Sequence, residues 1–206
     1  MGRTRDVSKI LTSNTSILTL ASASSVYQTI ATTGLVDITP STISVSGGSG
    51  SVSTTGAVSF TSASAISFNN VFSATYQNYK VIGNFTATTG NSNSCRLRVS
   101  DTDNTASSYV RQVVAADSAS LVASTLTTTF FDGFWMGSTH PSCLEASFYS
   151  PFESIRTNVL TRSTQEGTTY KQIGASHNVA SSFTGFTLIA ASGTFSGTVR
   201  IYGFNN

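Results

Sequence analysis

The chain of 206 residues has a formal net charge of +2, and only 10 % of its residues are charged. An average globular protein has about 25 % charged residues. The Lys and Arg residues are few and scattered, which argues against the dense basic patch of a nucleic-acid-binding protein. No apolar run approaches the ~18 residues of a membrane-spanning helix or the pattern of a signal peptide, so we expect no membrane insertion.

Serine and threonine dominate the composition, with 36 and 32 residues respectively. Threonine is β-branched and suits half-exposed strands, whereas the strong helix formers Glu, Lys and Leu are scarce. This composition predicts an all-β chain whose surface is wetted by hydroxyl groups rather than by charges. The expected fold is an antiparallel β-sandwich, jelly-roll-like, preceded by an extended N-terminal arm.

Residues 1–60 are predicted to form an attachment arm and linker, because Tyr27 is the only aromatic residue before Phe60. A polar, basic start is followed by a weak heptad of apolar residues, which needs a partner surface to become ordered. Residues 36–60 are predicted to form short β segments around a flexible turn at the GGSGS stretch, 47–51. The arm residues expected to dock on another protein are Arg3, Arg5, Lys9, Ile10, Leu11, Ile17 and Leu18.

Residues 61–206 are predicted to form the β-sandwich domain, because they alternate repeatedly with the period of two that is typical of strands. Turn-forming sequences separate these runs about every ten residues, which favours an antiparallel sandwich over βαβ units. In one run the alternation places Val99 in the core and Arg98 at the surface. The expected strands are 78–88, 94–100, 109–115, 124–131, 134–137, 144–149, 155–161, 170–175, 186–191 and 197–204.

The run at 197–204 is predicted to be the structural closing strand of the domain. Val199 and Ile201 alternate as core residues do, with Thr198 and Arg200 on the opposite face. Tyr202 is expected to supply a buried ring whose hydroxyl is hydrogen-bonded. We therefore expect the core to depend on Val199, Ile201 and Tyr202 together.

Common catalytic and metal-binding motifs are absent from the sequence, including the nucleophile elbow, the nucleotide-binding glycine motifs and HExxH. His140 and His177 are isolated and are predicted to be surface or turn residues. Asp101–Asn104 (DTDN) is predicted to be a hairpin turn rather than a calcium loop, because the glycine and glutamate that such a loop needs are replaced. We therefore expect a non-enzyme without a metal or cofactor.

Two other residue sets leave alternatives open. Cys95 and Cys143 are too few for a disulfide framework and are predicted to be small buried side chains, although a single bridge stays open. Six aromatic residues would form either a sugar-binding platform or part of the core or of an interface, and the second interpretation is favoured. They are Tyr76, Tyr79, Trp135, Tyr149, Tyr170 and Tyr202.

Two phrases, SFNNVFSATYQNYKVI at 67–82 and SGTVRIYGF at 196–204, resemble the opening and closing phrases of a β module common among virion proteins of tailed bacteriophages. The start MGRTRDVSKILTSNTSILTLASASSVY resembles the opening of structural proteins from cyanobacterial and other marine phages. Such modules are fibre, receptor-binding and head-decoration parts. The resemblance therefore implies a location in the virion, after synthesis in the host cytoplasm.

The functions implied by this resemblance divide into alternatives. The first is a tail or neck fibre, or another host-attachment component, held to other virion proteins by the N-terminal arm. The second is a capsid head-decoration (cement) protein. A carbohydrate-binding, lectin-like domain is a third hypothesis from a different class. The expected assembly is a homotrimer, with a host surface glycan as a further candidate partner.

Overall fold

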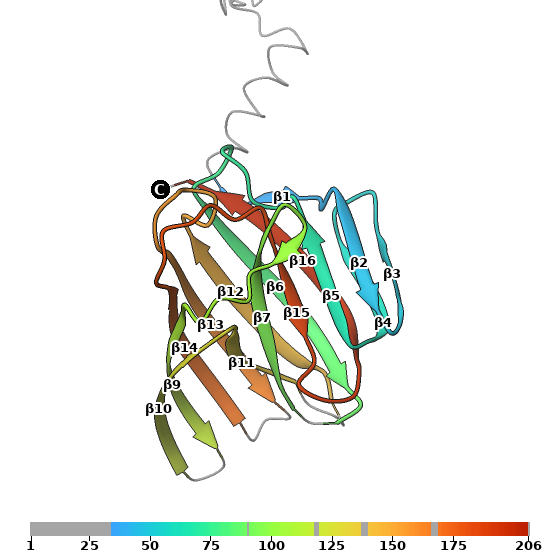
Figure 1. Cartoon of the computed structure of the whole chain (residues 1–206). Helices are drawn as coiled ribbons and strands as arrows, with labels where there is room; N and C mark the ends of the chain where they lie inside the picture. Colours follow the sequence, from blue (N-terminus) through green and yellow to red (C-terminus); the bar gives the residue numbers. More distant parts are fainter. Residues whose placement is uncertain (1–33, 90, 118–119, 137–139, 166–168, 206) are drawn as a thin grey trace, which may run out of the picture. The chain divides into compact units, whose positions relative to one another are not determined.

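The period-two runs of the sequence form strands in a computed structural model, which describes residues 34–205 except 90, 118–119, 137–139 and 166–168. The strands assemble into two antiparallel sheets that pack face to face (Figure 1). The predicted all-β antiparallel sandwich is therefore confirmed. Within the described residues there is no helix, and hence none that could cross a membrane.

The larger sheet has ten strands in the order β10-β9-β14-β13-β12-β6-β16-β4-β3, and β1 also pairs with β16. Neighbours pair antiparallel throughout, and β12, β13 and β14 form a meander. The bounds are β1 (Val36–Ile38), β3 (Ser49–Val52), β4 (Val58–Ala63), β6 (Asn78–Ala87), β9 (Tyr109–Asp117), β10 (Ser120–Thr128), β12 (Ser142–Tyr149), β13 (Thr157–Gln165), β14 (Thr169–His177) and β16 (Phe195–Phe204).

The smaller sheet has six strands in the order β11-β7-β15-β5-β2, with β8 paired to β7. Its strands are shorter or more irregular, and β11 shifts register against β7 between Asp132 and Phe134. The bounds are β2 (Thr42–Ser46), β5 (Ala65–Asn69), β7 (Asn91–Val99), β8 (Thr102–Asp103), β11 (Phe131–Met136) and β15 (Gly185–Ile189).

The core lies between the two sheets, where alternate side chains of each strand meet. On β6, Tyr79 and Phe85 are buried on the inner face, as the alternation predicted. Phe148 of the larger sheet and Phe186 of the smaller sheet stack with ring centroids 5.4 Å apart, and Phe72 packs on both rings. Aromatic rings therefore carry much of the contact between the sheets, because each buries a large apolar area.

The β unit begins at Val36, so the predicted boundary at residue 60 is corrected. Strand β1 pairs with β16, β2 pairs with β5, and β3 pairs with β4, which places residues 36–60 in both sheets. Aromatic content misplaced the boundary because these strands lie at the sheet margins and use rings supplied by other strands. The predicted turn is real but shorter, because Gly47 and Gly48 form it while Ser49 already belongs to β3.

Strand β16 is central in the larger sheet, with β6 on one side and β4 and β1 on the other. Val199 and Ile201 are each 1 % exposed, so their predicted place in the core is confirmed. Tyr202 is different from the prediction, because it lies on the opposite face of the strand and is only half-buried. Its position follows from the same alternation, since residues 201 and 202 of one strand point to opposite faces.

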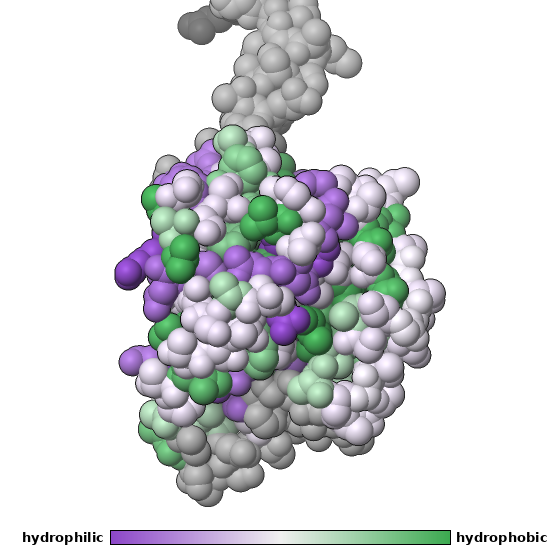
Figure 2. Space-filling model, in the orientation of Figure 1, coloured by the Kyte–Doolittle hydropathy of each residue, from purple (hydrophilic) through white to green (hydrophobic). Residues whose placement is uncertain are grey.

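The surface reflects the excess of hydroxyl side chains. Figure 2 shows one face of the molecule, on which pale residues of intermediate hydropathy predominate and strongly hydrophobic or hydrophilic residues are scattered. The described residues form four ion pairs, of which that between Arg200 and Asp37 is largely exposed. Solvation of the sandwich therefore depends little on charge.

The core position of Ile201 can be tested by truncating its side chain. We expect Ile201→Ala to lower the free energy of unfolding by about 2–5 kcal/mol, because it leaves a cavity between the sheets. Thr198→Ala, on the exposed face of the same strand, should cost less than about 1 kcal/mol. Urea titration followed by circular dichroism measures both, and equal losses for the two variants would show that β16 does not face the core as described.

Candidate functional site

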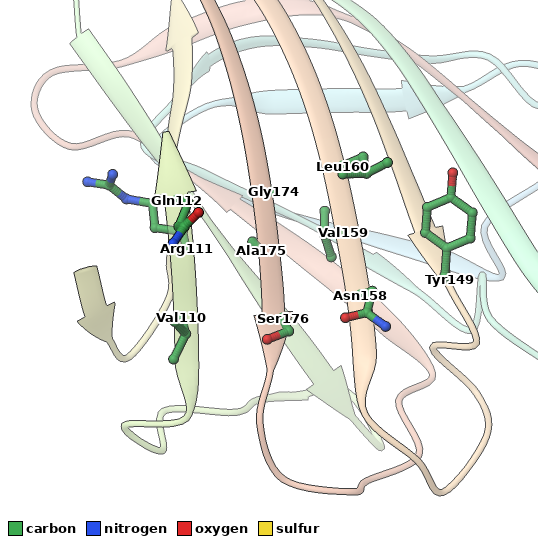
Figure 3. A pocket seen from close by; sticks show the side chains of 10 residues that line it. All are labelled: Val110, Arg111, Gln112, Tyr149, Asn158, Val159, Leu160, Gly174, Ala175 and Ser176. Carbon is green, nitrogen blue, oxygen red and sulfur yellow. The ribbon is translucent and has the colours of Figure 1, made fainter. Parts of the chain in front are cut away.

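A shallow groove of about 770 Å³ lies on the face of the larger sheet that is turned away from the core. Figure 3 shows that it crosses strands β9, β14, β13 and β12. Arg111 borders the groove, but its side chain points away from it, and Nη2 donates to Oδ2 of Asp132 at 2.9 Å. We call this surface the outer groove and define it by Val110, Gln112, Tyr149, Asn158, Leu160, Gly174 and Ser176.

The strand register explains why these side chains meet. Gly174 lies between Gln112 of β9 and Leu160 of β13, directly across the sheet. One step along the same face, Ser176 lies between Val110 and Asn158, and Asn158 is opposite Tyr149 of β12. The groove is thus lined by amide, hydroxyl and phenol groups and by the apolar side chains of Val110 and Leu160, around a residue without a side chain.

Gly174 has no structural need to be glycine. A Cβ built there meets a single neighbour, Cδ2 of Leu160 at 3.8 Å, which is an ordinary contact, and its φ is not positive. Other strand glycines are different, because a Cβ at Gly197 would collide with the carbonyl oxygen of Asn84 and one at Gly203 with the ring of Tyr76. A glycine inside a strand often marks a place where another molecule approaches the backbone.

One end of the outer groove is charged. A smaller hollow of about 190 Å³ shares Tyr149 and Leu160 with the groove and adds Lys80, Glu145 and Arg162. Nζ of Lys80 is 2.6 Å from Oε1 of Glu145, and this hydrogen bond, aided by Arg162, lowers the pKa of the Glu145 carboxyl. Glu145 is therefore ionised and paired at neutral pH, which leaves Arg162 as the excess positive charge.

A third hollow of about 240 Å³ continues from this charged end and is mostly apolar. Ile82 and Tyr170 line it, and each is 42 % exposed. Cys143 also lines it, with Sγ 2.8 Å from Oγ1 of Thr164. Neighbouring hollows share lining residues: Tyr149 and Leu160 line both the groove and the charged hollow, and Glu145 and Arg162 line both the charged hollow and the third one.

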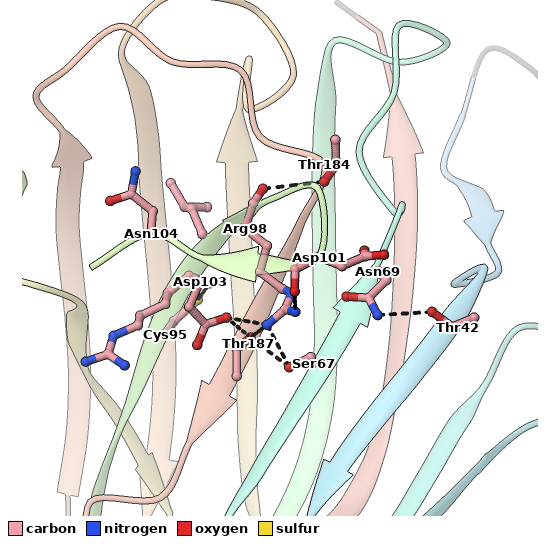
Figure 4. Close-up of polar contacts among 12 residues, drawn as sticks. Thr42, Ser67, Asn69, Cys95, Arg98, Asp101, Asp103, Asn104, Thr184 and Thr187 are labelled. Atoms are coloured by element: carbon pink, nitrogen blue, oxygen red, sulfur yellow. Dashed lines mark hydrogen bonds and ion pairs between the residues drawn. The ribbon is translucent and has the colours of Figure 1, made fainter. Parts of the chain in front are cut away.

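A second polar cluster lies on the outer face of the smaller sheet (Figure 4). Arg98 donates through Nη1 to Oγ of Ser67 at 2.9 Å and to Oγ1 of Thr187 at 2.8 Å, and it forms an ion pair with Asp103. Thr187 also donates to Oδ1 of Asp103 at 2.6 Å. These contacts fix strand β8 on the sheet, so we assign the cluster a structural role.

The same cluster corrects the predicted faces of β7. Arg98 is buried under β8, and Val99, predicted to be in the core, is 42 % exposed. Ser100 and Asp101 have positive φ angles and form the turn between β7 and β8, so a hairpin turn exists but lies earlier than predicted, and Thr102 and Asp103 of the DTDN sequence form β8 instead. Alternation correctly placed Arg98 on the outer face of β7, but it did not predict that β8 would cover this side chain.

The cysteine and histidine predictions are each half right. Cys95 is buried and Cys143 is exposed; both are free thiols, on different sheets. Burial raises the pKa of the Cys95 thiol, so this group stays protonated. His140 is exposed, but His177 is fully buried between Tyr109 and Phe183, which corrects its predicted surface position.

Several predicted site residues lie elsewhere. Arg3, Arg5, Lys9, Ile10, Leu11, Ile17 and Leu18 lie outside the described residues. Of the six aromatic residues, Tyr149 lines the outer groove, Tyr170 lines the third hollow and Tyr79 is buried in the core, so they form no single platform. Sequence reasoning missed Gln112, Asn158, Gly174 and Ser176, although an interior strand glycine on an exposed face was a usable signal.

Comparison with known proteins yields no family. No family model and no curated protein matches this chain. Among solved structures, arcelin-5, a lectin-like defence protein from Phaseolus vulgaris, is 8 % identical, with 81 % of this chain and 97 % of that chain covered and a TM-score of 0.20. Lectin II from Ulex europaeus is 11 % identical, covers 79 % and 95 %, and has a TM-score of 0.17. TM-scores this low do not transfer a site or a ligand.

The described residues contain no group of three or more His, Cys, Asp or Glu side chains that could hold a metal ion. The outer groove likewise lacks a nucleophile paired with a base, since its polar lining is amide, hydroxyl and phenol. The arrangement can form hydrogen bonds and one ion pair with a ligand.

The glycine contrast gives a stability test. We expect Gly174→Ala to raise the free energy of unfolding by about 0.5–1 kcal/mol, because alanine reduces the entropy lost on folding and fits the space present. Gly197→Ala should destabilise the protein, since its Cβ collides with backbone. Differential scanning calorimetry of both variants measures the two shifts, and a destabilised Gly174→Ala would mean that the fold itself requires this glycine.

Proposed function

We propose that this chain is a non-enzymatic structural protein of a phage particle, of the tail- or neck-fibre kind, that takes part in host attachment. Residues 1–35 hold it to other virion proteins. The β unit from Val36 onward presents the outer groove to the host surface. This assignment combines the phrase resemblance with the architecture of the β unit.

The observation that carries the proposal is that the two resembling phrases build one structural unit. The phrase at 67–82 forms β5, a turn and the start of β6, and the phrase at 196–204 forms β16, which pairs with β6. The Tyr79 hydroxyl donates to the carbonyl oxygen of Ser73 and accepts from its N–H, both at 2.8 Å. Gly203 leaves room for the ring of Tyr76. These two phrases, distant in the sequence, thus correspond to one contiguous piece of structure.

The surface composition also supports a particle protein. Exposed ion pairs weaken as salt screens them. Hydration of an uncharged hydroxyl group, by contrast, depends little on ionic strength. A surface rich in Ser and Thr suits a protein that must stay folded outside the cell in varying salt. The outer groove supplies a recessed, solvent-exposed face on such a protein, as host attachment requires.

The location of the chain in the particle tests this function. We expect antibody labelling and electron microscopy to place it at the tail or neck, and residues 36–206 alone to fold but not to enter particles, because they lack the docking segment. Labels at regular sites over the head would overturn the fibre assignment and favour the head-decoration alternative. Incorporation of the truncated chain would overturn the arm.

We also propose that the chain assembles as a homotrimer. Strand β10, at one edge of the larger sheet, has nine residues without a charge or a proline, the features that commonly protect an edge from further pairing. Leu121 on this strand is 77 % exposed. A closed ring of copies buries such edges without leaving an open end.

Multi-angle light scattering tests the assembly. We expect a trimer for the full chain, and Leu121→Lys should shift the mass towards the monomer, because it places a charge on the exposed edge strand. Thr198→Lys, also exposed but on the central strand β16, is the control and should leave the mass unchanged. A monomer at every concentration of the native chain would contradict the proposal.

A further inference from the structure

We infer that the outer groove binds an acidic glycan, with a hexuronic acid ring over Gly174 and its carboxylate on Arg162. The inference rests on the proposed function only in that host attachment supplies a glycan surface; the binding chemistry itself stands on the groove. Three features carry it: the gap at Gly174, the neutral polar lining around that gap, and the single excess cation beside it.

The gap fits a ring lying flat on the sheet. Gly174 exposes backbone between the side chains of Gln112 and Leu160, so a ligand can approach the strand there more closely than at any residue with a Cβ. A pyranose ring has apolar C–H faces and a rim of hydroxyl groups. Leu160 offers an apolar contact to such a face, and the ring of Tyr149 stands at the β12 side of the groove (Figure 3).

The lining matches the rim of a sugar. Gln112 and Asn158 each present a carboxamide, which both donates and accepts. Ser176 presents a hydroxyl oxygen that can accept, since its O–H donates to Oδ1 of Asn178 at 3.0 Å. Sugar hydroxyl groups also donate and accept, so each can be paired without leaving a buried group unsatisfied. Ligand sites generally combine a hollow with a few convergent polar groups of this kind.

The charge selects an acidic sugar over a neutral one. Arg162 lies two residues from Leu160 on the same face of β13, about 7 Å along the strand. It forms no ion pair among the residues that the structure describes, and its cross-strand neighbour Glu145 is paired with Lys80. A planar guanidinium binds a carboxylate through two parallel hydrogen bonds, which also fixes the orientation of the ring.

Calorimetry on the full chain with matched oligosaccharides tests the inference. The ligands are tetrasaccharides of galacturonate and of galactose, which differ only at C6. We expect the uronate to bind and the neutral sugar to bind at least ~10-fold more weakly, which corresponds to one ion pair of ~1.4 kcal/mol. Raising NaCl from 50 to 500 mM should weaken uronate binding, because salt screens the exposed guanidinium.

Two variants locate the site. Arg162→Gln should weaken uronate binding at least ~10-fold and remove the preference over galactose. Gly174→Val should weaken binding of both sugars by filling the gap. An unchanged circular dichroism spectrum is the control, because it would show that the sheet is intact. Arg200→Gln removes the same charge on the same row of the sheet, outside the groove, and Ala116→Val adds methyl groups on the same face; neither should change binding.

The outcomes separate this inference from the proposed function. Equal binding of both sugars, no binding of either at millimolar concentration, or native binding by Gly174→Val would overturn the acidic-glycan site. None of these results depends on where the chain lies in a particle. Conversely, uronate binding by a chain found on the head would support the site and overturn the fibre assignment.

Discussion

The pairing of β6 with β16 is the constraint on which the rest of the structure depends. The two strands match over ten successive positions, from Phe195 opposite Ala87 to Phe204 opposite Asn78, although more than a hundred residues separate them. Closing so long a loop costs entropy that only a long, well-packed contact recovers. Once formed, the pair presents one edge to β12 and the other to β4 and β1, so both halves of the larger sheet extend from it.

The outer groove is a consequence of that extension. Strand β12 adds to β6, β13 and β14 follow as a meander, and β9 then joins β14 from a distant part of the chain. Inner-face residues such as Phe148 and Val159 are committed to the core, which leaves the alternate positions free. Those free positions carry Gln112, Asn158 and Ser176, polar side chains that add little to stability. The strand periodicity thus separates the residues that hold the fold from those that can bind a ligand.

Because the chain has few charged residues, each ion pair can be assigned a particular structural role. Ion pairs hold particular pieces in place: Arg98 with Asp103 fixes β8, and Arg111 with Asp132 links the two sheets. On the outer face, Lys80 neutralises Glu145, so Arg162 stands as the excess charge beside a neutral groove. The charges beside it, Lys80 and Glu145, are paired with each other, so Arg162 is the cation left to bind an anionic ligand.

The sequence alone determined most of the strands from residue 78 onward, the sandwich and the core face of β16, because a period of two in apolar residues is a local property that packing preserves. Tyr202 and Val99 show the limit of that argument. Alternation predicts which side chains share a face of a strand, but not whether other elements bury that face. The place of residues 36–60 was also decided by tertiary structure, since β1–β3 complete sheets whose aromatic residues come from elsewhere. The groove was beyond sequence reasoning, because Gly174 meets Gln112 and Leu160 only through the register of β14 with its neighbours, and β9 comes from a distant part of the chain.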